Sequence, residues 1–347
     1  MPQRVRWGIV GVGDVTERKS GPAFQQADRS ELVAVMRRDA AKAADFAARH
    51  AVPRWYDDAD ALIADPEVDA VYIATPPDSH RDYVERVAAA GKPVYVEKPM
   101  ARTATECRAM IDACETAGVP LFVAYYRRAM PRFEIARELI SGGRLGEVRS
   151  VIIRTQHPGP DLSGGLPWRL DPQVSGGGLF VDLGSHTLDW LDHVFGPVTE
   201  AAGRASHPLA GPGSVETVVS ASFRFAGGVS AVGLWDFDAA ERVDRIEIIG
   251  TEGSLALSSF GPEPLMLTSG GVTEEIAAPY PDVVQRPLVQ GIVDVLTGRA
   301  HTAVSTGESA LRTASVVDAV LADYRAEHGI SFWAVAGSGL RFRRSPE

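Results

Sequence analysis

The stretch of the sequence richest in chemically active side chains is residues 176–195, GGGLFVDLGSHTLDWLDHVF. At about 100° of rotation per residue in an α-helix, Asp182, His186, Asp189 and His193 fall within roughly 60° of one another. The other side of such a helix is apolar, and the stretch contains no Lys or Arg. The pattern predicts an amphipathic helix behind three glycines, with acids and imidazoles along one face.

Three interpretations of this face are open. The first is a solvated helix surface, which is the ordinary role of a polar stripe. The second is a metal site, because a carboxylate and an imidazole four residues apart can share a cation. The third is an acid/base pair that lines a cleft, with the glycines allowing another group to approach the backbone closely.

A second group of candidate residues follows the first apolar run. In VRWGIVGVGDVTERKSGPAF, Gly11 and Gly13 lie where a strand ends and a helix begins. Glycines at this place permit a tight turn and let a pyrophosphate approach backbone N–H groups. The third position of the glycine fingerprint is Thr16, so the motif alone is weak. We predict a dinucleotide site here, with Asp14 and Val15 among its contacts.

The end of the second predicted strand indicates which dinucleotide binds. In NAD-binding folds an acid at this place holds the adenosine ribose hydroxyls. In ELVAVMRRDAAKA the place is taken by Arg37, followed by Arg38. An arginine cannot accept a hydroxyl hydrogen bond, but its planar donors fit a phosphate. The pair favours NADP over NAD; Asp39 close by and a solvated arginine pair are the counter-arguments.

Two kinds of secondary structure are predicted to position these residues. As far as about residue 125, β-branched runs alternate with Ala-rich amphipathic stretches, which predicts a parallel sheet covered on both faces. The predicted strands are 5–10, 31–36, 70–75, 93–97 and 121–126, and the predicted helices are 14–28, 40–50, 57–64, 79–90 and 103–117.

After a predicted helix at 131–141 the pattern changes to strands joined by short glycine turns. These strands lie within 147–156, 215–238 and 244–259, with FAGGVS as the clearest hairpin. This half of the chain should therefore form a largely antiparallel sheet. Residues 156–175 are a long loop that leads into the helix of 176–195, and loops of that length are more often functional than incidental. A last helix is predicted at 306–328.

Composition restricts the class of protein. The chain has 347 residues, of which 45% are hydrophobic and 23% charged, as in a globular protein with two cores. Its 35 basic and 45 acidic side chains give a net charge of -10, which argues against a nucleic-acid-binding surface. Neither a signal-peptide pattern nor a run of about 18 apolar residues is present. We expect a cytoplasmic enzyme or binding protein with no membrane partner.

Two further segments make the pattern specific. VYIATPPDSH at 71–80 covers the end of the strand predicted at 70–75, and VYVEKPM at 94–100 covers the end of the strand predicted at 93–97. Together with GGGLFVDLGSHTLDW, these segments resemble the Gfo/Idh/MocA family of oxidoreductases, and the resemblance extends over about residues 4–330. The combination of Glu-Lys-Pro with Asp-x-x-x-His is far more specific than the glycine loop.

The resemblance implies both a fold and an activity. The fold is α/β: an N-terminal Rossmann domain with a doubly wound parallel sheet at 1–126, a C-terminal α+β domain on a large, mostly antiparallel open sheet at 127–335, and a tail at 336–347. The activity is NADP- or NAD-dependent hydride transfer between the nicotinamide and a secondary alcohol or ketone of a sugar, inositol or related polyol. A homodimer or homotetramer built through the C-terminal sheet is also implied.

The resemblance assigns roles to individual residues. Lys98, Asp182 and His186 form the catalytic set and contact substrate; no metal is expected. Independently of the resemblance, Tyr126 in YYRR is a candidate substrate contact. Our hypothesis makes His186 the acid/base, since an imidazole exchanges protons near neutral pH; the division of labour between Lys98 and His186 varies in the family and stays open. Asp182 binds a substrate hydroxyl or orients the imidazole, and Lys98 stabilises charge on the reacting oxygen. Cofactor contacts carry over to Gly11, Gly13, Arg37, Arg38, Thr75, Pro76, His80, Glu97 and Lys98, and to the pair Trp168 and Arg169.

Several alternatives stay open. The sequence departs from the family pattern at Thr16, at Arg37 and in the long turn TERKSGPAF, where Lys19 is either a surface residue or part of the cleft. Asp189 and His193 have a support or solvent role, and Tyr126 is a substrate contact or a packed aromatic. Two other functions are redox-neutral chemistry with a tightly bound nucleotide and a non-catalytic NADP-sensing regulator.

Overall fold

A computed structural model describes residues 2–207 and 214–329, and within this part the chain forms two compact units. Unit 1 comprises the residues as far as Ala101, together with Glu106–Met130 and Pro281–Leu311. Unit 2 comprises Arg102–Thr105, Pro131–Tyr280 and the described residues from Arg312 on. The predicted boundary at 126/127 lies near Met130, whereas residues 281–311 return to unit 1. The tail predicted at 336–347, and 330–335 before it, lie outside the described residues.

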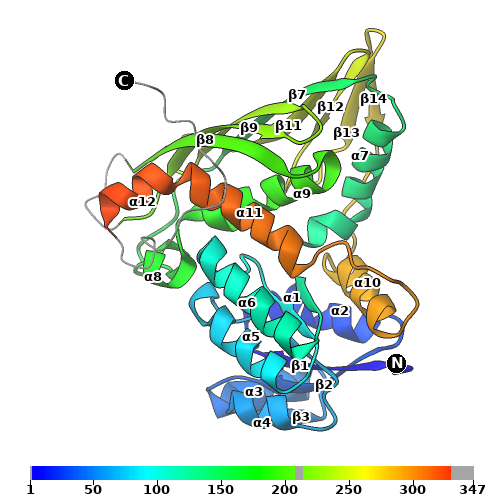
Figure 1. Ribbon diagram of the computed structural model, residues 1–347, viewed down its shortest axis with the longest axis vertical. Helices are drawn as coiled ribbons and strands as arrows, with labels where there is room; N and C mark the ends of the chain where they lie inside the picture. Colours follow the sequence, from blue (N-terminus) through cyan, green and yellow to red (C-terminus); the bar gives the residue numbers. More distant parts are fainter. Residues whose placement is uncertain (1, 208–213, 330–347) are drawn as a thin grey trace. The chain divides into compact units, whose positions relative to one another are not determined.

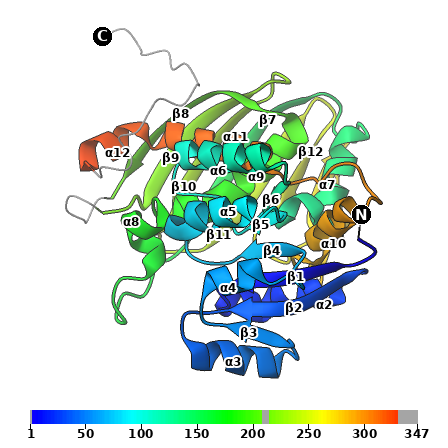
Figure 2. The same cartoon turned by 60° about the horizontal axis from the view of Figure 1, so that its bottom comes forward.

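The centre of unit 1 is a parallel sheet, as predicted, with six strands in place of the five predicted (Figure 2). Its strand order is β3 (Arg54–Tyr56), β2 (Ser30–Met36), β1 (Val5–Val10), β4 (Ala70–Ile73), β5 (Val94–Val96) and β6 (Leu121–Val123). From β1 the chain adds β2 and β3 on one side and then β4, β5 and β6 on the other, so the strand order reverses between β1 and β4. In doubly wound sheets a dinucleotide binds beyond the carboxyl ends of the strands at such a reversal.

Most helices of this part of the chain connect successive strands, and one comes from the segment 281–311. They are α1 (Asp14–Arg18), α2 (Gly21–Gln26), α3 (Ala40–Arg49), α4 (Ala59–Ala64), α5 (His80–Ala89), α6 (Ala104–Ala117) and α10 (Arg286–Leu296). The single helix predicted at 14–28 is two helices. A Cβ on Gly21 would lie 2.1 Å from the carbonyl oxygen of Thr16, and Pro22 occupies the first turn of α2. The chain therefore breaks the first helix and begins a second one at this glycine.

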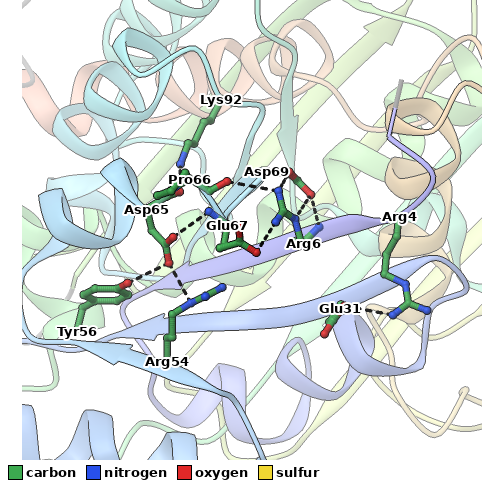
Figure 3. A network of polar contacts seen from close by, with 10 residues as sticks. All are labelled: Arg4, Arg6, Glu31, Arg54, Tyr56, Asp65, Pro66, Glu67, Asp69 and Lys92. Carbon is green, nitrogen blue, oxygen red and sulfur yellow. Dashed lines mark hydrogen bonds and ion pairs between the residues drawn. The ribbon is translucent and has the colours of Figure 1, made fainter.

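A network of polar side chains links residues of β1 and β3 to the loop between α4 and β4 and to Lys92 before β5 (Figure 3). The Arg6 guanidinium donates through Nη2 to Asp69 Oδ1 at 2.7 Å and through Nε to Asp69 Oδ2 at 3.0 Å. Asp65 accepts the Tyr56 hydroxyl at 2.9 Å, and Lys92 Nζ donates to the Asp65 carbonyl at 2.7 Å. Arg6 lies near the start of β1 and the glycine loop follows its end, so this network supports the sheet rather than the site.

Unit 2 is built on an eight-stranded sheet, mostly antiparallel as predicted (Figure 1). Its order is β14 (Val272–Ile276), β13 (Leu265–Ser269), β12 (Gly253–Leu257), β11 (Val243–Gly250), β7 (Val148–Gln156), β10 (Ser230–Asp236), β9 (Val218–Phe225) and β8 (Val198–Ser206). Neighbouring strands pair antiparallel except β7 and β10, which are parallel. The predicted FAGGVS hairpin joins β9 to β10, and Gly228 has a φ of 87° in its turn.

The two faces of this sheet differ. Figure 1 shows α9 (Ser185–Phe195), α11 (Gly307–Val320) and α12 (Ala322–His328) along one face; α7 (Pro131–Ser141) and α8 (Pro172–Ser175) also belong to this part of the chain. No helix in the described part of the chain covers the other face. On β10, Trp235 is buried whereas Val232 is 54% exposed, and its β7 neighbour Ile152 is 44% exposed. The uncovered face therefore carries an apolar strip.

Among the helices described in residues 2–207 and 214–329, none is long and apolar enough to cross a bilayer.

Candidate active site

The glycine loop after β1 has the local geometry of a dinucleotide site. Gly11 has a φ of 94°, and a Cβ there would lie 2.6 Å from Thr75 Cγ2 and 3.0 Å from Thr75 N. Only glycine fits this approach of the loop to the end of β4. A Cβ on Gly13, in contrast, would meet no described atom within 4 Å, so the backbone here is open to a phosphate group. These residues fit a bound dinucleotide.

Thr16 has a local reason to replace the third glycine of the fingerprint. Its side chain is fully buried. The hydroxyl accepts the Gly13 N–H at 2.7 Å and donates to the Gly13 carbonyl at 2.7 Å. The threonine therefore closes the first turn of α1 on itself. Asp14 and Lys19 are exposed on the same segment and Val15 is half-buried.

The two arginines at the end of β2 are placed differently. Arg37 is half-buried, and its Nη1 donates to the carbonyl of Val12 in the glycine loop at 3.1 Å, while Arg38 is exposed. Asp39 accepts the backbone N–H of Lys42 at 3.1 Å and so caps α3. That hydrogen bond holds the pKa of the Asp39 carboxyl below its ordinary value. The acid nearest the predicted ribose position is thus engaged as a helix cap.

His80 links the end of β4 to the backbone that follows Lys98. Its ring has no exposed surface. Nε2 lies 2.7 Å from the Thr75 carbonyl oxygen, and Nδ1 lies 3.1 Å from the carbonyl oxygens of both Pro99 and Met100. Burial lowers the pKa of this imidazole. In the structure His80 braces the loop, and a direct contact with the cofactor remains a prediction, as it does for Thr75 and Pro76.

Glu97 belongs to a buried hydrogen-bond network. Its Oε1 accepts the Tyr72 hydroxyl at 2.5 Å and Gln285 Nε2 at 2.7 Å, and its Oε2 accepts the backbone N–H of Lys98 at 3.0 Å. Tyr95 donates to Gln285 Oε1 at 2.8 Å. Burial raises the pKa values of Tyr72 and Tyr95 well above the usual range, so both hydroxyls stay protonated. The carboxylate thereby fixes the backbone from which the Lys98 side chain extends.

In unit 2, four of the predicted site residues belong to two short segments. Asp182 lies in a π-helical turn, Phe180–Gly184, and His186 is in the first turn of α9. Arg169 Nε lies 3.4 Å from Asp182 Oδ2, and the Arg169 guanidinium lies 4.4 Å from the centre of the Trp168 ring. The π turn changes the phase that a regular α-helix assigns to Asp182, and such turns are frequent at functional sites.

The rest of the polar stripe corrects one interpretation, because it is not a solvated face. His186 is 3% exposed, and Asp189 has no exposed surface and accepts the Thr313 hydroxyl at 3.2 Å. Asp192 accepts from Arg312 Nη2 at 2.7 Å. His193 Nε2 lies 3.7 Å from a Glu134 carboxylate oxygen. Two carboxylates of the stretch, Asp182 and Asp192, thus have arginine partners from other segments, Arg169 and Arg312.

Two other predicted features have a place in the structure. Tyr126, in the short 3-10 helix Tyr126–Ala129, is 7% exposed, and the Arg127 guanidinium lies 5.2 Å from the centre of its ring. Substrate contact by this side chain remains a prediction. Across residues 2–207 and 214–329, no group of three or more His, Cys, Asp and Glu side chains is arranged to hold a metal ion.

Comparison with known families decides the class. Residues 5–125 match the model described as oxidoreductase family, NAD-binding Rossmann fold, and residues 133–256 match the GFO/IDH/MocA C-terminal domain. The chain belongs to the Gfo/Idh/MocA family of oxidoreductases. This Gfo/Idh/MocA protein is therefore a nicotinamide-dependent dehydrogenase or reductase, as its motifs predicted.

Individual relatives match over most of their length. Oxidoreductase P35 of Formosa agariphila is 36% identical over 90% of this chain and 97% of its own. The 1,5-anhydro-D-fructose reductase of Ensifer adhaerens is 31% identical over 72% of this chain and 74% of its own. Among solved structures, the aldose-aldose oxidoreductase of Caulobacter crescentus, complexed with glycerol, is 26% identical with a TM-score of 0.83, over 93% of this chain and 98% of that one.

Proposed function

We propose that this Gfo/Idh/MocA enzyme transfers hydride between NADP and a secondary alcohol or ketone of a sugar, inositol or related polyol. The observation that carries the cofactor choice is the end of β2. Arg37 lies against the glycine loop with its planar donors, and Asp39 is engaged as the cap of α3. A 2′-phosphate needs donors, whereas free ribose hydroxyls need an acceptor. The arrangement therefore favours the phosphorylated cofactor.

The substrate class is supported by what the relatives are named for. One relative is a 1,5-anhydro-D-fructose reductase, another a D-xylose 1-dehydrogenase (NADP(+)), and a solved relative is an aldose-aldose oxidoreductase. Carboxylate, imidazole and ammonium groups supply the partners that several neighbouring hydroxyls require.

When bound, the nicotinamide supplies or accepts the hydride. The chain's own residues manage the proton and the charge. As the substrate alcohol is oxidised, the proton of its hydroxyl passes to a ring nitrogen of His186, and Lys98 donates a hydrogen bond to the oxygen and stabilises its negative charge. Asp182 holds a second hydroxyl or the imidazole, with Arg169 at 3.4 Å. These roles come from the family motif and are part of the proposal.

A two-step experiment tests this function. NADPH and NADH are first titrated by quenching of tryptophan fluorescence, and we expect the tighter binding for NADPH. With the better oxidised cofactor, polyols, inositols and aldoses are then screened for formation of reduced nicotinamide. Turnover of at least one class supports the proposal. No turnover with any of them, in either direction, contradicts it.

A second candidate is redox-neutral chemistry with a retained nucleotide, which the name of the aldose-aldose relative favours. It predicts that nucleotide stays with the purified protein and that one sugar is oxidised while another is reduced. Dialysed protein that is nucleotide-free and fully active with added NADP excludes this candidate.

We also propose that the chain forms a homodimer or homotetramer through the uncovered face of the eight-stranded sheet. The apolar strip of Ile152, Val232 and Leu234 supports this, because exposed apolar patches on sheets mark association surfaces.

A further inference from the structure

The three glycines before the π turn are required by what packs against them. Gly176 has a φ of 82°, and a Cβ there would lie 2.7 Å from Arg102 Cα. A Cβ on Gly177 would lie 2.4 Å from Val181 Cγ2 and 3.2 Å from Glu216 Oε2, and one on Gly178 would lie 2.5 Å from the Glu216 carbonyl oxygen. Glu216 therefore makes the closest approach at Gly178 and a second, looser one at Gly177.

Glu216 is a buried carboxyl with an unusual environment. It is 1% exposed and sits two residues before β9. Its Oε1 accepts the Gly178 N–H at 2.8 Å, and its Oε2 has no hydrogen-bond partner among the described residues. Burial raises the pKa of Glu216 to about 7, against the opposing effects of the Gly178 amide and of Arg325.

Arg325 on α12 holds the same turn from another side. Its Nη2 donates to the Gly176 carbonyl at 3.1 Å, and its Nη1 pairs with Asp318. A carboxyl and a guanidinium thus bind the backbone of Gly176 and Gly178, two residues apart. The turn follows directly on α8, which ends at Ser175.

The Gly178 peptide passes this constraint on to the catalytic segment. Its N–H donates to Glu216, and its carbonyl accepts the backbone N–H of Asp182 at 3.2 Å. Asp182 in turn carries the carboxylate that faces Arg169. A displacement of the Gly178 amide would therefore move the start of the π turn together with Asp182.

We propose that Glu216 is a positioning residue whose carboxyl fixes the Gly176–Gly178 turn and, through the Gly178 peptide, the location of Asp182. The proposal rests on the proposed function, because it takes Asp182 to act on the substrate. A displacement of about 1 Å at a reacting group can cost about 10²-fold in rate. The role is specific in its geometry: it needs an acceptor at the reach of a glutamyl side chain and does not need a negative charge.

Two variants separate reach from charge. Glu216→Gln keeps the length and an acceptor oxygen but removes the charge. Glu216→Asp keeps the charge opposite Arg325 but withdraws the acceptor from Gly178 by one methylene. Positioning predicts a kcat within about threefold of wild type for E216Q and at least about tenfold lower for E216D, with the Kd for NADPH unchanged in both. If Glu216 only neutralises Arg325, E216D is the active variant and E216Q the impaired one, and the proposal is overturned.

Hydrogen exchange of the backbone amides in residues 176–186, measured by mass spectrometry, gives a readout that needs no substrate. We expect faster exchange at Gly178 and Asp182 in E216D and wild-type exchange in E216Q, with thermal melting as the control for folding. Unchanged exchange in E216D, or unchanged kcat despite faster exchange, overturns the proposal. Absence of turnover in the wild type would refute the proposed function. The exchange data, which need no substrate, would still test whether Glu216 fixes the turn.

Discussion

The raised pKa of Glu216 makes a quantitative prediction about stability. A carboxyl with a pKa of about 7 in the folded protein, against 4.5 for the free group, binds its proton more tightly when folded. Its contribution to stability is therefore fully present below about pH 4.5 and is lost as pH rises through 7. At about 1.36 kcal/mol for each tenfold change in proton affinity, the loss is roughly 3 kcal/mol. Glu216→Gln cannot ionise and should not show it.

The assay is urea unfolding of wild type and E216Q at a series of pH values between 4.5 and 8. The difference in unfolding free energy, variant minus wild type, should rise by roughly 3 kcal/mol across this range. Tyr324, whose pKa is raised by burial and by Glu216, stays protonated over this range. His207, whose Nδ1 lies 2.6 Å from the carbonyl oxygen of Val215, is present in both proteins. Its effect on the unfolding free energy therefore cancels in the difference between them. Parallel stability curves would refute the reasoning.

Three further predictions concern the cofactor, the turn and the sheet. Arg37→Asp should weaken NADPH binding by about tenfold or more and NADH by less than about threefold, since charged hydrogen bonds are worth about 1.5–3 kcal/mol; fluorescence titration with equal losses for both cofactors would contradict this. Gly178→Ala places a Cβ 2.5 Å from the Glu216 carbonyl oxygen and should lower the unfolding free energy by about 1–3 kcal/mol, whereas Gly227→Ala, with its nearest atom at 3.6 Å, should cost less than about 1 kcal/mol; similar urea midpoints would refute the packing argument. Val232→Glu puts a charge on the uncovered sheet face and should reduce the mass measured by light scattering to that of one chain; an unchanged mass means that the interface lies elsewhere.

The parallel sheet could be predicted because the residues of its main strands themselves indicate strand structure. β1, β2 and β4 are β-branched runs, buried on both faces, and alternate with amphipathic helices. β3 has only three residues, and β8, VTEAAGRAS, is rich in Ala and Gly. Such segments become strands through their sheet neighbours rather than by their own propensity, so the sequence did not predict them.

The site divides in the same way. Glu97, Lys98, Asp182 and His186 stand in short motifs whose spacing is visible in the sequence. The residues that hold these side chains in place do not stand in such motifs. Gln285, for example, donates to Glu97 from 188 residues away. Glu216 likewise had no neighbouring motif, although the three glycines that pack on it were conspicuous. Only the fold brings such distant partners together, and its buried polar groups then identify them.

The solvated-face interpretation of 176–195 failed for a related reason. Helical phase shows which side chains share a face but not what covers that face. Here Thr313 and Arg312, both more than 100 residues away, supply the partners of Asp189 and Asp192. A polar stripe without cations is therefore consistent with a buried face paired from outside the helix.

The central claim is that His186 carries the proton of the substrate hydroxyl and does not contribute to the affinity for the cofactor. Its most direct test is kcat of His186→Ala, measured on the polyol that the wild type turns over, with the Kd for NADPH measured in parallel. The account predicts a fall in kcat of about 10²- to 10⁴-fold with a Kd within about twofold of wild type. Wild-type turnover in H186A would contradict it.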